Sequence, residues 1–199
     1  MFDVSAMNMQ SWYLLMVMFM NEPTADGAWL LDDFSADQSG FDWYVVNDNV
    51  MGGRSEGGFQ VEAGELYFSG STNTRGGGFS SIRTRPVEFD LSAFNGVRLK
   101  VKGDGRRYTW RLATDARWRG RPISYWADFD TSKDAWTTVE IPFTNFVPRF
   151  RGQTLDGPAL DTGKITEMGL MIYDELDGAF ELRLARVQAY KEQTPASHP

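Results

Sequence analysis

Apolar and polar residues alternate with a period of two through most of this chain. In 97–102 and 107–112, every second residue is apolar and the residues between them are Arg, Lys or Thr. A similar alternation occurs in 123–129 and 180–185. Because successive side chains of a β-strand point to opposite faces, each of these segments is predicted to be a half-buried strand.

Other segments predict strands of different kinds. Residues 59–61 and 66–68 flank Ala63-Gly64 and are predicted to form a short hairpin. Residues 137–143 form a further strand, and the proline within it indicates an edge position or the end of the strand. The mostly apolar run 165–173 is typical of a strand that is buried on both faces.

The predicted strands are short, and no long amphipathic helix pattern separates them. Gly-rich turns lie between them instead. This organisation predicts an all-β fold, either an antiparallel β-sandwich or a jelly roll. We expect one such domain over 29–191, an N-terminal extension at 1–28 and a disordered tail at 192–199.

The N-terminal extension contains an apolar run at 12–20. A membrane-spanning helix needs about 20 apolar residues, so this run is too short to be a transmembrane segment. No Lys or Arg precedes it, which argues against a strong signal peptide and against a basic transit peptide. We therefore interpret 1–28 as a mis-assigned start or a weak signal-like segment.

Composition excludes several kinds of chemistry. The chain of 199 residues contains no Cys, and its one His, His198, lies in the predicted tail. Disulfides, thiolate catalysis, Cys-ligated zinc and mechanisms that need an ordered His are therefore excluded. Asp and Glu number 27 against 20 Lys and Arg, which gives a net charge of −7. This balance argues against a nucleic-acid partner.

Charge is unevenly distributed along the chain. Residues 1–70 carry a net charge of −10, residues 71–121 carry +8 and residues 122–199 carry −5. Gly103-Asp104-Gly105 is typical of a tight turn, so 97–102 and 107–112 are predicted to pair as a hairpin. One face of that pair would carry the basic residues Arg98, Lys100, Lys102, Arg107 and Arg111. The face is either a solubilising surface or a docking surface for an acidic partner.

The segment 47–57 is unusually rich in glycine. It lies among predicted strands and contains no Lys, so it does not fit a phosphate-binding loop. We interpret it as a Gly-rich turn in which Asp48 accepts backbone N–H groups and Ser55 does likewise. The residues expected to have structural roles are Asn47, Asp48, Gly52, Gly53 and Ser55, together with Gly103, Asp104 and Gly105.

A series of short segments in a fixed order covers about residues 30–190. They are Leu31-Asp32-Asp33-Phe34-Ser35, Trp43, Asn47-Asp48, Met51-Gly52-Gly53-Arg54-Ser55, Gly77-Gly78-Phe79-Ser80-Ser81-Ile82-Arg83, Val101-Lys102-Gly103-Asp104-Gly105-Arg106, Trp136, Ile141-Pro142-Phe143, Phe146, Phe150-Arg151-Gly152 and Asp177-Gly178-Ala179-Phe180-Glu181-Leu182. This series resembles the thirty-kilodalton complex I intermediate-associated protein family. The resemblance implies a galactose-binding-domain-like jelly roll and a non-catalytic role, because the mitochondrial members are assembly factors that hold intermediates of respiratory complex I.

Our first functional hypothesis is a non-enzymatic binding protein, a chaperone-like holder of protein intermediates such as respiratory-complex subunits. Arg and aromatic side chains are the usual anchors of protein interfaces. The candidate binding residues are Arg83, Arg107, Arg111, Tyr125, Trp126, Arg149 and Arg151. The open alternative is that Tyr125 packs in the core and the arginines pair with nearby carboxylates.

The second hypothesis is a sugar binder similar to carbohydrate-binding modules. Its candidate stacking residues are Trp110, Trp118, Trp126 and Tyr125. An enzyme is disfavoured, because no spacing singles out the two carboxylates that a glycosidase needs. We expect no cofactor. A structural Ca²⁺ is the alternative to solvated loop carboxylates, with ligands from Asp32, Asp33 and Asp48 or from Asp174, Glu175 and Asp177.

The lack of a basic transit peptide leads us to expect a bacterial cytoplasmic protein. The protein would instead be exported if the apolar run at 12–20 is a signal peptide.

Overall fold

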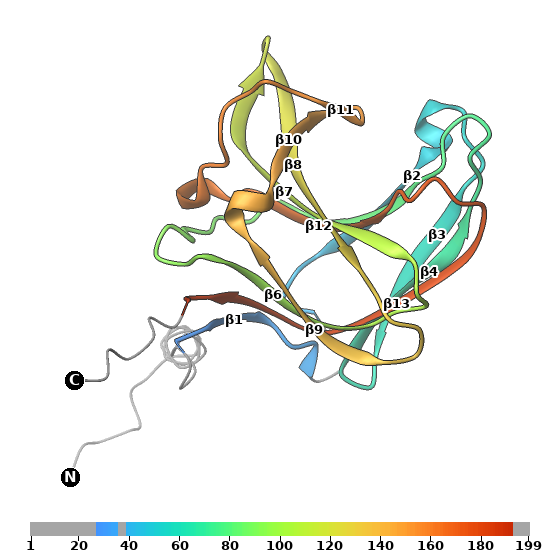
Figure 1. The fold of residues 1–199 in the computed structure, drawn as a ribbon, viewed down its shortest axis with the longest axis horizontal. Helices are drawn as coiled ribbons and strands as arrows, with labels where there is room; N and C mark the ends of the chain where they lie inside the picture. Colours follow the sequence, from blue (N-terminus) through green and yellow to red (C-terminus); the bar gives the residue numbers. More distant parts are fainter. Residues whose placement is uncertain (1–26, 36–38, 193–199) are drawn as a thin grey trace, which may run out of the picture.

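The fold is a sandwich of two antiparallel β-sheets. The computed structural model describes residues 27–35 and 39–192, and the predicted extension and tail lie almost wholly outside them. Figure 1 shows the two layers, with β6, β9 and β13 in one and β7, β8 and β12 in the other. The predicted all-β sandwich is confirmed. Within the described residues, no helix has the length and apolar character needed to cross a membrane.

Sheet A has the strand order β3-β4-β13-β6-β9, and β1 pairs with β13 beside this path. Its strands are β1 (Trp29–Asp32), β3 (Glu56–Glu62), β4 (Glu65–Thr72), β6 (Gly96–Lys102), β9 (Trp136–Pro142) and β13 (Gly178–Tyr190). Sheet B has the order β11-β10-β8-β7-β12-β5-β2. Its strands are β2 (Trp43–Asn47), β5 (Ser80–Thr84), β7 (Arg107–Trp118), β8 (Arg121–Asp130), β10 (Val147–Phe150), β11 (Gln153–Thr154) and β12 (Glu167–Ile172). The short 3₁₀ segments are η2 (Asp48–Met51), η3 (Phe143–Asn145) and η4 (Thr162–Lys164).

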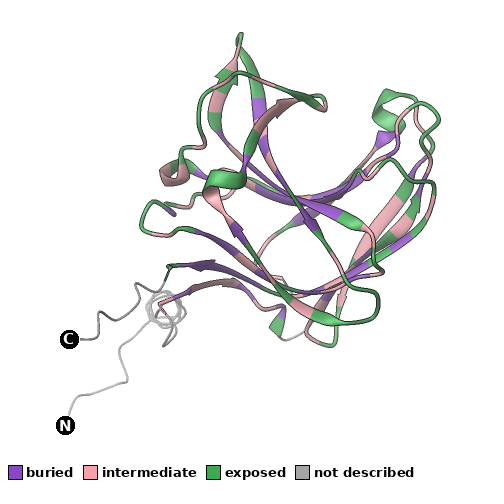
Figure 2. Ribbon diagram, viewed as in Figure 1, coloured by how far each residue is buried: buried purple, intermediate pink, exposed green. Residues whose placement is uncertain are grey.

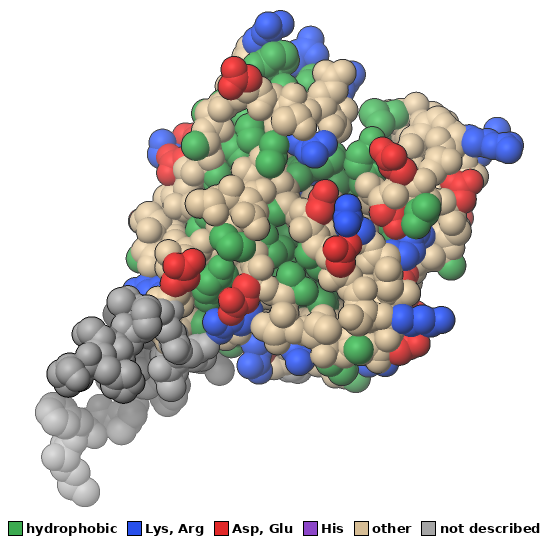
Figure 3. Space-filling model, in the orientation of Figure 1, with side chains coloured by type: hydrophobic (Ala, Val, Ile, Leu, Met, Phe, Trp, Pro, Cys, Tyr) green, Lys and Arg blue, Asp and Glu red, His purple; other side chains and the backbone are tan. Residues whose placement is uncertain are grey.

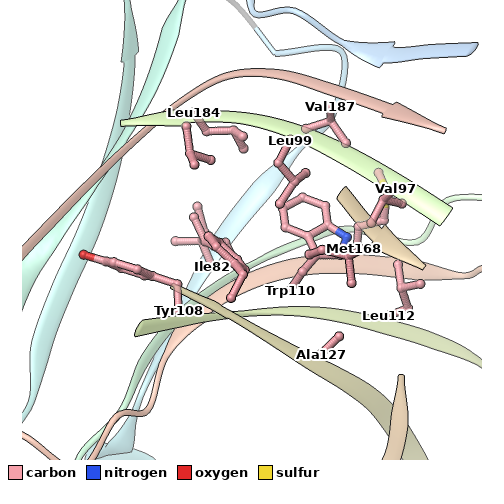
Figure 4. Packing of buried hydrophobic residues seen from close by; sticks show 14 of the residues in the cluster. Ile82, Val97, Leu99, Tyr108, Trp110, Leu112, Ala127, Met168, Leu184 and Val187 are labelled. Atoms are coloured by element: carbon pink, nitrogen blue, oxygen red, sulfur yellow. The ribbon is translucent and has the colours of Figure 1, made fainter. Parts of the chain in front are cut away.

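The core lies between the inner faces of the two sheets. Trp110 and Leu112 of β7 pack toward Leu99 of β6 and Val187 of β13 (Figure 4), and all four side chains are buried. In Figure 2 the buried residues follow the strands, while the turns are exposed. The period-two alternation therefore reports correctly which side chains of these strands face the core.

Most predicted strands are confirmed. The hairpin around Ala63-Gly64 joins β3 to β4, and β9 is an edge strand, as its proline indicates. Strand β12 lies between β7 and β5, and both its inward Leu170 and its outward Met171 are buried. The prediction that this strand is buried on both faces is therefore confirmed.

The predicted hairpin between 97–102 and 107–112 is wrong. Both edges of β6 are occupied, by β13 and β9, so no edge is left to pair with β7. The turn at Gly103–Gly105 instead carries the chain from sheet A into sheet B. Consequently the five basic residues predicted on one face are divided between two sheets: Arg98, Lys100 and Lys102 lie on sheet A, and Arg107 and Arg111 on sheet B.

Two such crossings lie side by side and are held together by an ion pair between Arg106 and Asp174, the inter-sheet clamp. Arg106 Nε donates to Asp174 Oδ2 at 2.8 Å and Nη2 donates to Oδ1 at 2.6 Å. The exposed fractions of the two side chains are only 12% and 5%. The hydrogen bond that Arg106 donates to Asp174 raises the pKa of Arg106, so the guanidinium stays charged at any ordinary pH.

The remaining donors of the Arg106 guanidinium bind the backbone of the β12–β13 crossing. Nη1 donates to the carbonyls of Gly178 and Ala179 at 3.1 and 3.0 Å, and Nη2 donates to the carbonyl of Leu176 at 2.8 Å. Nη2 also binds Thr72 Oγ1 at 3.0 Å, at the end of β4. One side chain therefore connects the β6–β7 crossing to the β12–β13 crossing and to a third strand.

A second buried carboxylate, that of Asp48, organises the Gly-rich segment. Its oxygens accept hydrogen bonds from the N–H and hydroxyl of Ser55 at 2.8 and 2.6 Å and from the N–H of Gly78 at 2.6 Å. A Cβ added to Gly53 would lie 2.2 Å from the Asp48 carboxyl carbon, and one added to Gly77 would lie 2.4 Å from an oxygen. These glycines are needed because the carboxylate fills the space a side chain would take. Burial alone would raise the pKa of Asp48, but its hydrogen bonds outweigh burial and lower it.

The clamp predicts a large loss of stability on removal of the guanidinium. Arg106→Met is expected to lower the free energy of unfolding by about 3–5 kcal/mol, because Asp174 is left buried without its partner. Urea unfolding followed by tryptophan fluorescence measures the change. Arg107→Met is the matched control, since Arg107 pairs with Asp130 and both side chains are largely exposed. Equal losses in the two variants would contradict the role of the clamp.

The Asp48 carboxylate predicts a pH-dependent contribution to stability. Its folded-state pKa lies below that of an unfolded Asp, about 3.9, so its hydrogen bonds stabilise the fold at neutral pH and lose that effect as pH falls through the folded-state pKa. Asp48→Asn is therefore expected to lower the melting temperature by several degrees at pH 7, with a smaller difference from wild type near pH 3. Thermal melts at both pH values measure this, with the exposed Asp156→Asn as control. A pH-independent difference would argue against the charged form as the stabilising group.

Candidate functional site

The outer face of sheet B is hollowed. Figure 1 shows the β10–β11 end and the β2 end of the sheet rising on either side of β12, and Figure 3 shows a notch in the surface between these two lobes. Five strands place one residue each in register across this face. This outer-face row consists of Trp126, Arg111, Gly169, Arg83 and Tyr44.

Arg111 is the most deeply buried charge of the outer-face row. A Cβ added to Gly169 would lie 2.8 Å from Arg111 Cγ, so the arginine occupies the space above the glycine on β12. Its guanidinium pairs with Glu167 at 2.7 Å, and Glu167 also accepts the hydroxyl of Tyr44 at 3.1 Å. Burial first, and then repulsion from Arg83, lowers the pKa of Arg111 to about 10. Arg111 Nε is buried without a hydrogen-bond partner among the described residues.

Trp126 anchors an aromatic cluster at one end of the row. The ring of Tyr173, the residue after β12, meets it edge to face with centroids 6.0 Å apart. The guanidinium of Arg149 lies 5.3 Å from the centre of the Trp126 ring. The indole N–H donates to Ser124 Oγ at 2.8 Å, which fixes the ring orientation. Cation and rings together make a surface that is both apolar and positively charged.

The carboxylates of this face are already engaged. Glu167 pairs with Arg111, Asp130 pairs with Arg107 at 2.8 Å, and Asp128 accepts the hydroxyl of Thr109 at 2.6 Å. In contrast, Arg83 has no carboxylate partner among the described residues, and its Nε meets only Ser81 Oγ, at 3.4 Å. The face therefore presents guanidinium groups and aromatic rings beside carboxylates that are hydrogen-bonded to neighbouring side chains.

The structure brings most of the predicted binding residues together. Arg83, Arg107, Arg111, Trp126 and Arg149 all belong to the outer face of sheet B. Arg151 lies at its margin, in the turn between β10 and β11. These five residues come from β5, β7, β8 and β10, and nothing in their sequence spacing predicts that these strands are neighbours.

Tyr125 is the exception, and its placement on the binding face is wrong. It alternates along β8 with Trp126, so the two side chains point to opposite faces. Tyr125 is fully buried in the core, and its hydroxyl donates to the carbonyl of Ala159 at 3.3 Å. The alternative stated for the arginines, pairing with carboxylates, holds for Arg107 and Arg111 and does not hold for Arg83, Arg149 or Arg151 within the described residues.

Sequence reasoning missed Tyr44, Gly169 and Tyr173. The one available signal was the glycine inside the apolar run 165–173, since an interior glycine of a strand often marks a close approach by another group. That group is Arg111. The positions of Tyr44 and Tyr173 follow from strand order alone, which the sequence does not display.

The candidates for sugar stacking are mostly covered. Trp110 and Tyr125 are buried in the core. Trp118 carries the guanidinium of Arg119 at 4.4 Å from its ring centre, and Trp126 carries that of Arg149. Two of the four candidates are therefore buried in the core, and the other two each carry an arginine over the ring.

The carboxylates proposed for calcium are occupied in other ways. Asp32 accepts the N–H groups of Phe34 and Gly40, Asp48 is bound as described above, and Asp174 pairs with Arg106. Within 27–35 and 39–192, no three His, Cys, Asp or Glu residues are grouped to hold a metal ion.

Relatives of this chain occur in fungi and animals. An uncharacterized protein of Schizosaccharomyces pombe is 30% identical over 180 residues, which is 77% of this chain and 80% of that protein. The mitochondrial complex I intermediate-associated protein 30 of Mus musculus is 28% identical over 71% of this chain, and that of Drosophila melanogaster is 28% identical over 76%. The chain spans 50% and 59% of the length of these two proteins.

A solved structure supports the fold. The family 11 carbohydrate-binding module of the cellulase Lic26A-Cel5E of Clostridium thermocellum superposes with a TM-score of 0.62 and 19% identity, over 86% of this chain and 99% of the module. At this identity the likeness concerns the fold alone, and it confirms the predicted jelly-roll-like architecture.

These relatives also correct the expected location. The prediction of a bacterial cytoplasmic protein is wrong, because the matched relatives are eukaryotic and those of mouse and fly are named as mitochondrial. The model of the complex I intermediate-associated protein 30 family matches residues 32–184, which is most of the sandwich. The chain therefore belongs to the complex I intermediate-associated protein 30 family.

Proposed function

We propose that this chain is a non-enzymatic binding protein that takes part in the assembly of respiratory complex I by holding a protein partner on the outer face of sheet B. Family membership supports the assembly role, since two relatives carry that association in their names. The observation that carries the proposal is the outer-face row, in which Arg83 and Arg111 lie between Tyr44 and Trp126.

The dimensions and chemistry of the row suit a polypeptide. Adjacent strands lie about 4.8 Å apart, so a row across five strands is about 19 Å long, the span of some six residues in extended conformation. Aromatic and arginine side chains dominate the binding energy of most protein interfaces. Trp126 is held by Ser124, so little side-chain entropy is lost when a partner contacts it.

The same face offers little to an enzyme mechanism. Catalysis by acid and base needs two groups with free lone pairs or protons in reach of one substrate. Here Glu167, Asp128 and Asp130 each already bind a neighbouring side chain. This engagement supports the non-enzymatic role.

The alternative function is a sugar binder. It is favoured by the aromatic pair of Trp126 and Tyr173 and by the likeness to carbohydrate-binding modules, one of which was solved with a β-1,3-1,4-mixed-linked tetrasaccharide. A sugar ring stacks on an open aromatic face, and the Trp126 face is occupied by Arg149. The occupied ring makes a protein partner the stronger candidate.

A titration with that tetrasaccharide separates the two functions. We expect calorimetry to show no saturable binding with a dissociation constant below about 1 mM. A dissociation constant of about 1 mM corresponds to a binding free energy of only about 4 kcal/mol. Binding that is abolished by Trp126→Ala and kept by Trp136→Ala, an exposed tryptophan of sheet A, would favour the sugar binder instead.

Photocrosslinking in the native host tests the proposed partner. A photoreactive residue replaces Asp128, exposed on the outer face of sheet B, or Lys100, exposed on the outer face of sheet A. We expect complex I subunits or their assembly intermediates to be crosslinked from position 128. Recovery from position 100 should be lower by about tenfold, because an interface covers only about a tenth of a protein's surface and position 100 lies outside the proposed one. Recovery of such subunits from position 100 alone, or from neither position, would contradict the proposal.

A further inference from the structure

A four-residue pattern, Arg-aromatic-Arg-Gly, occurs twice in the chain. It is Arg117-Trp118-Arg119-Gly120 in one place and Arg149-Phe150-Arg151-Gly152 in the other. Both copies form the turn of a hairpin, the first between β7 and β8 and the second between β10 and β11. The strand registers join Trp118 to Arg121 and Phe150 to Gln153, so an Arg-Gly pair is the two-residue loop in each case.

The two turns have the same conformation. Arg119 and Gly120 have φ values of 50° and 78°, and Arg151 and Gly152 have 50° and 81°. Positive φ at both loop residues is the mark of a type I′ turn, where Asn-Gly is the preferred pair. In each turn the first arginine of the pattern donates from Nη1 to the glycine carbonyl, at 3.1 Å from Arg117 and 2.9 Å from Arg149.

The two turns also lie side by side, because β10 pairs with β8. The rings of Trp118 and Phe150 are 6.4 Å apart between centroids. Arg119 lies over Trp118 at 4.4 Å, while Arg151 and Arg121 lie over Phe150 at 5.6 and 5.5 Å. We call this group the arginine tip; its members are Arg117, Arg119, Arg121, Arg149 and Arg151 around Trp118 and Phe150.

The arginine tip has no internal counter-charge. Among the described residues, none of its five arginines is in an ion pair. Several arginines elsewhere behave differently: Arg98, Arg106 and Arg183 each pair with a carboxylate. In a chain of net charge −7, acidic side chains are plentiful, yet none reaches this group. Five cations at one end repel each other unless an anion is supplied from outside.

The fold does not explain the choice of arginine in the two loops. A side chain other than Gly, Asn or Asp is disfavoured at positive φ. The third turn of this kind in the sandwich has Ala63 with Gly64, a small residue at the same place. Arg119 and Arg151 are exposed, and their ring contacts are with Trp118 and Phe150 at the surface of the core. An unfavourable residue kept at an exposed turn points to a role outside the fold.

We infer that the arginine tip docks an acidic segment of a partner protein, one that presents several Asp or Glu side chains. This inference deepens the proposed function and depends on it only for the partner being a protein. The guanidinium groups of Arg119, Arg121 and Arg151 lie over the rings of Trp118 and Phe150, and because these three side chains are exposed, their N–H edges are available to a ligand. Each such edge can donate two parallel hydrogen bonds to one carboxylate, a geometry that Lys does not offer.

The arrangement fits an acidic polypeptide better than a lipid surface. Proteins that insert into a membrane expose apolar or aromatic side chains at the tip. Here the rings lie under the guanidinium groups, and no large apolar side chain among those found to be exposed belongs to the tip. The Lys and Arg side chains at the top of Figure 3 form the outermost layer of that lobe.

The inference is tested with a fluorescently labelled hexaglutamate peptide. Its binding to the whole chain is measured by fluorescence anisotropy. The test variant is Arg119→Asn with Arg151→Asn, in which Asn suits the turn conformation, so the fold is expected to be kept or stabilised. The matched control is Lys100→Gln with Arg186→Gln, which removes the same charge from exposed positions of sheet A. We expect the affinity to fall about tenfold in the test variant and less than about twofold in the control.

Specificity is checked with hexaglutamine, which we expect not to bind, and with salt, since raising NaCl from about 50 to 300 mM should weaken the binding of hexaglutamate. No hexaglutamate binding, or equal losses in the test and control variants, would overturn the inference. So would tighter, tip-dependent binding to anionic phospholipid vesicles or to a polynucleotide than to the peptide. Because the peptide assay contains no complex I subunit, its result stands apart from the crosslinking result. Each proposal can therefore fail while the other holds.

Discussion

The inter-sheet clamp between Arg106 and Asp174 is the contact on which the rest of the arrangement depends. The chain passes from β6 of sheet A to β7 of sheet B at Gly103–Gly105, and it passes from β12 of sheet B to β13 of sheet A through the second crossing. Backbone carbonyls at the start of β13 and in the segment before it need hydrogen-bond donors where they are partly buried. The planar guanidinium of Arg106 supplies donors for three of them while its charge is balanced by Asp174. A lysine, with no planar fork, does not reproduce this geometry.

The position of these crossings determines which residues form the outer face of sheet B. Strand β12 lies in the middle of sheet B and leads to the clamp. Its Gly169 has no side chain, which leaves room for the side chain of Arg111. Arg111 is buried there against Glu167, so the row is rigid before any partner arrives. A clamp at one end and a buried ion pair in the middle thus make a pre-organised surface, which lowers the entropic cost of binding.

Two groups of arginines in this protein have different physical roles. One group is paired with carboxylates and serves the sandwich, as at Arg106 and Arg111. The other group, the arginine tip, is stacked on rings and has no carboxylate partner within the described residues. Buried cations need a partner because desolvation is costly, whereas exposed cations stay solvated and remain available. Buried arginines such as Arg106 therefore hold the fold, whereas the exposed arginines of the tip can bind a partner. This division places the available charge next to the outer face of sheet B.

The sequence by itself determined the strands, the sandwich class and the inward side of each strand, because a period of two is a local property of the backbone. It also displayed the glycines around Asp48 and both copies of the Arg-aromatic-Arg-Gly pattern. Only the tertiary structure decided which strands are neighbours. It removed Tyr125 from the binding face, divided the basic residues of β6 and β7 between two sheets, and set Trp118 against Phe150. Strand order depends on contacts between residues far apart in the chain, and alternation within a strand carries no information about them.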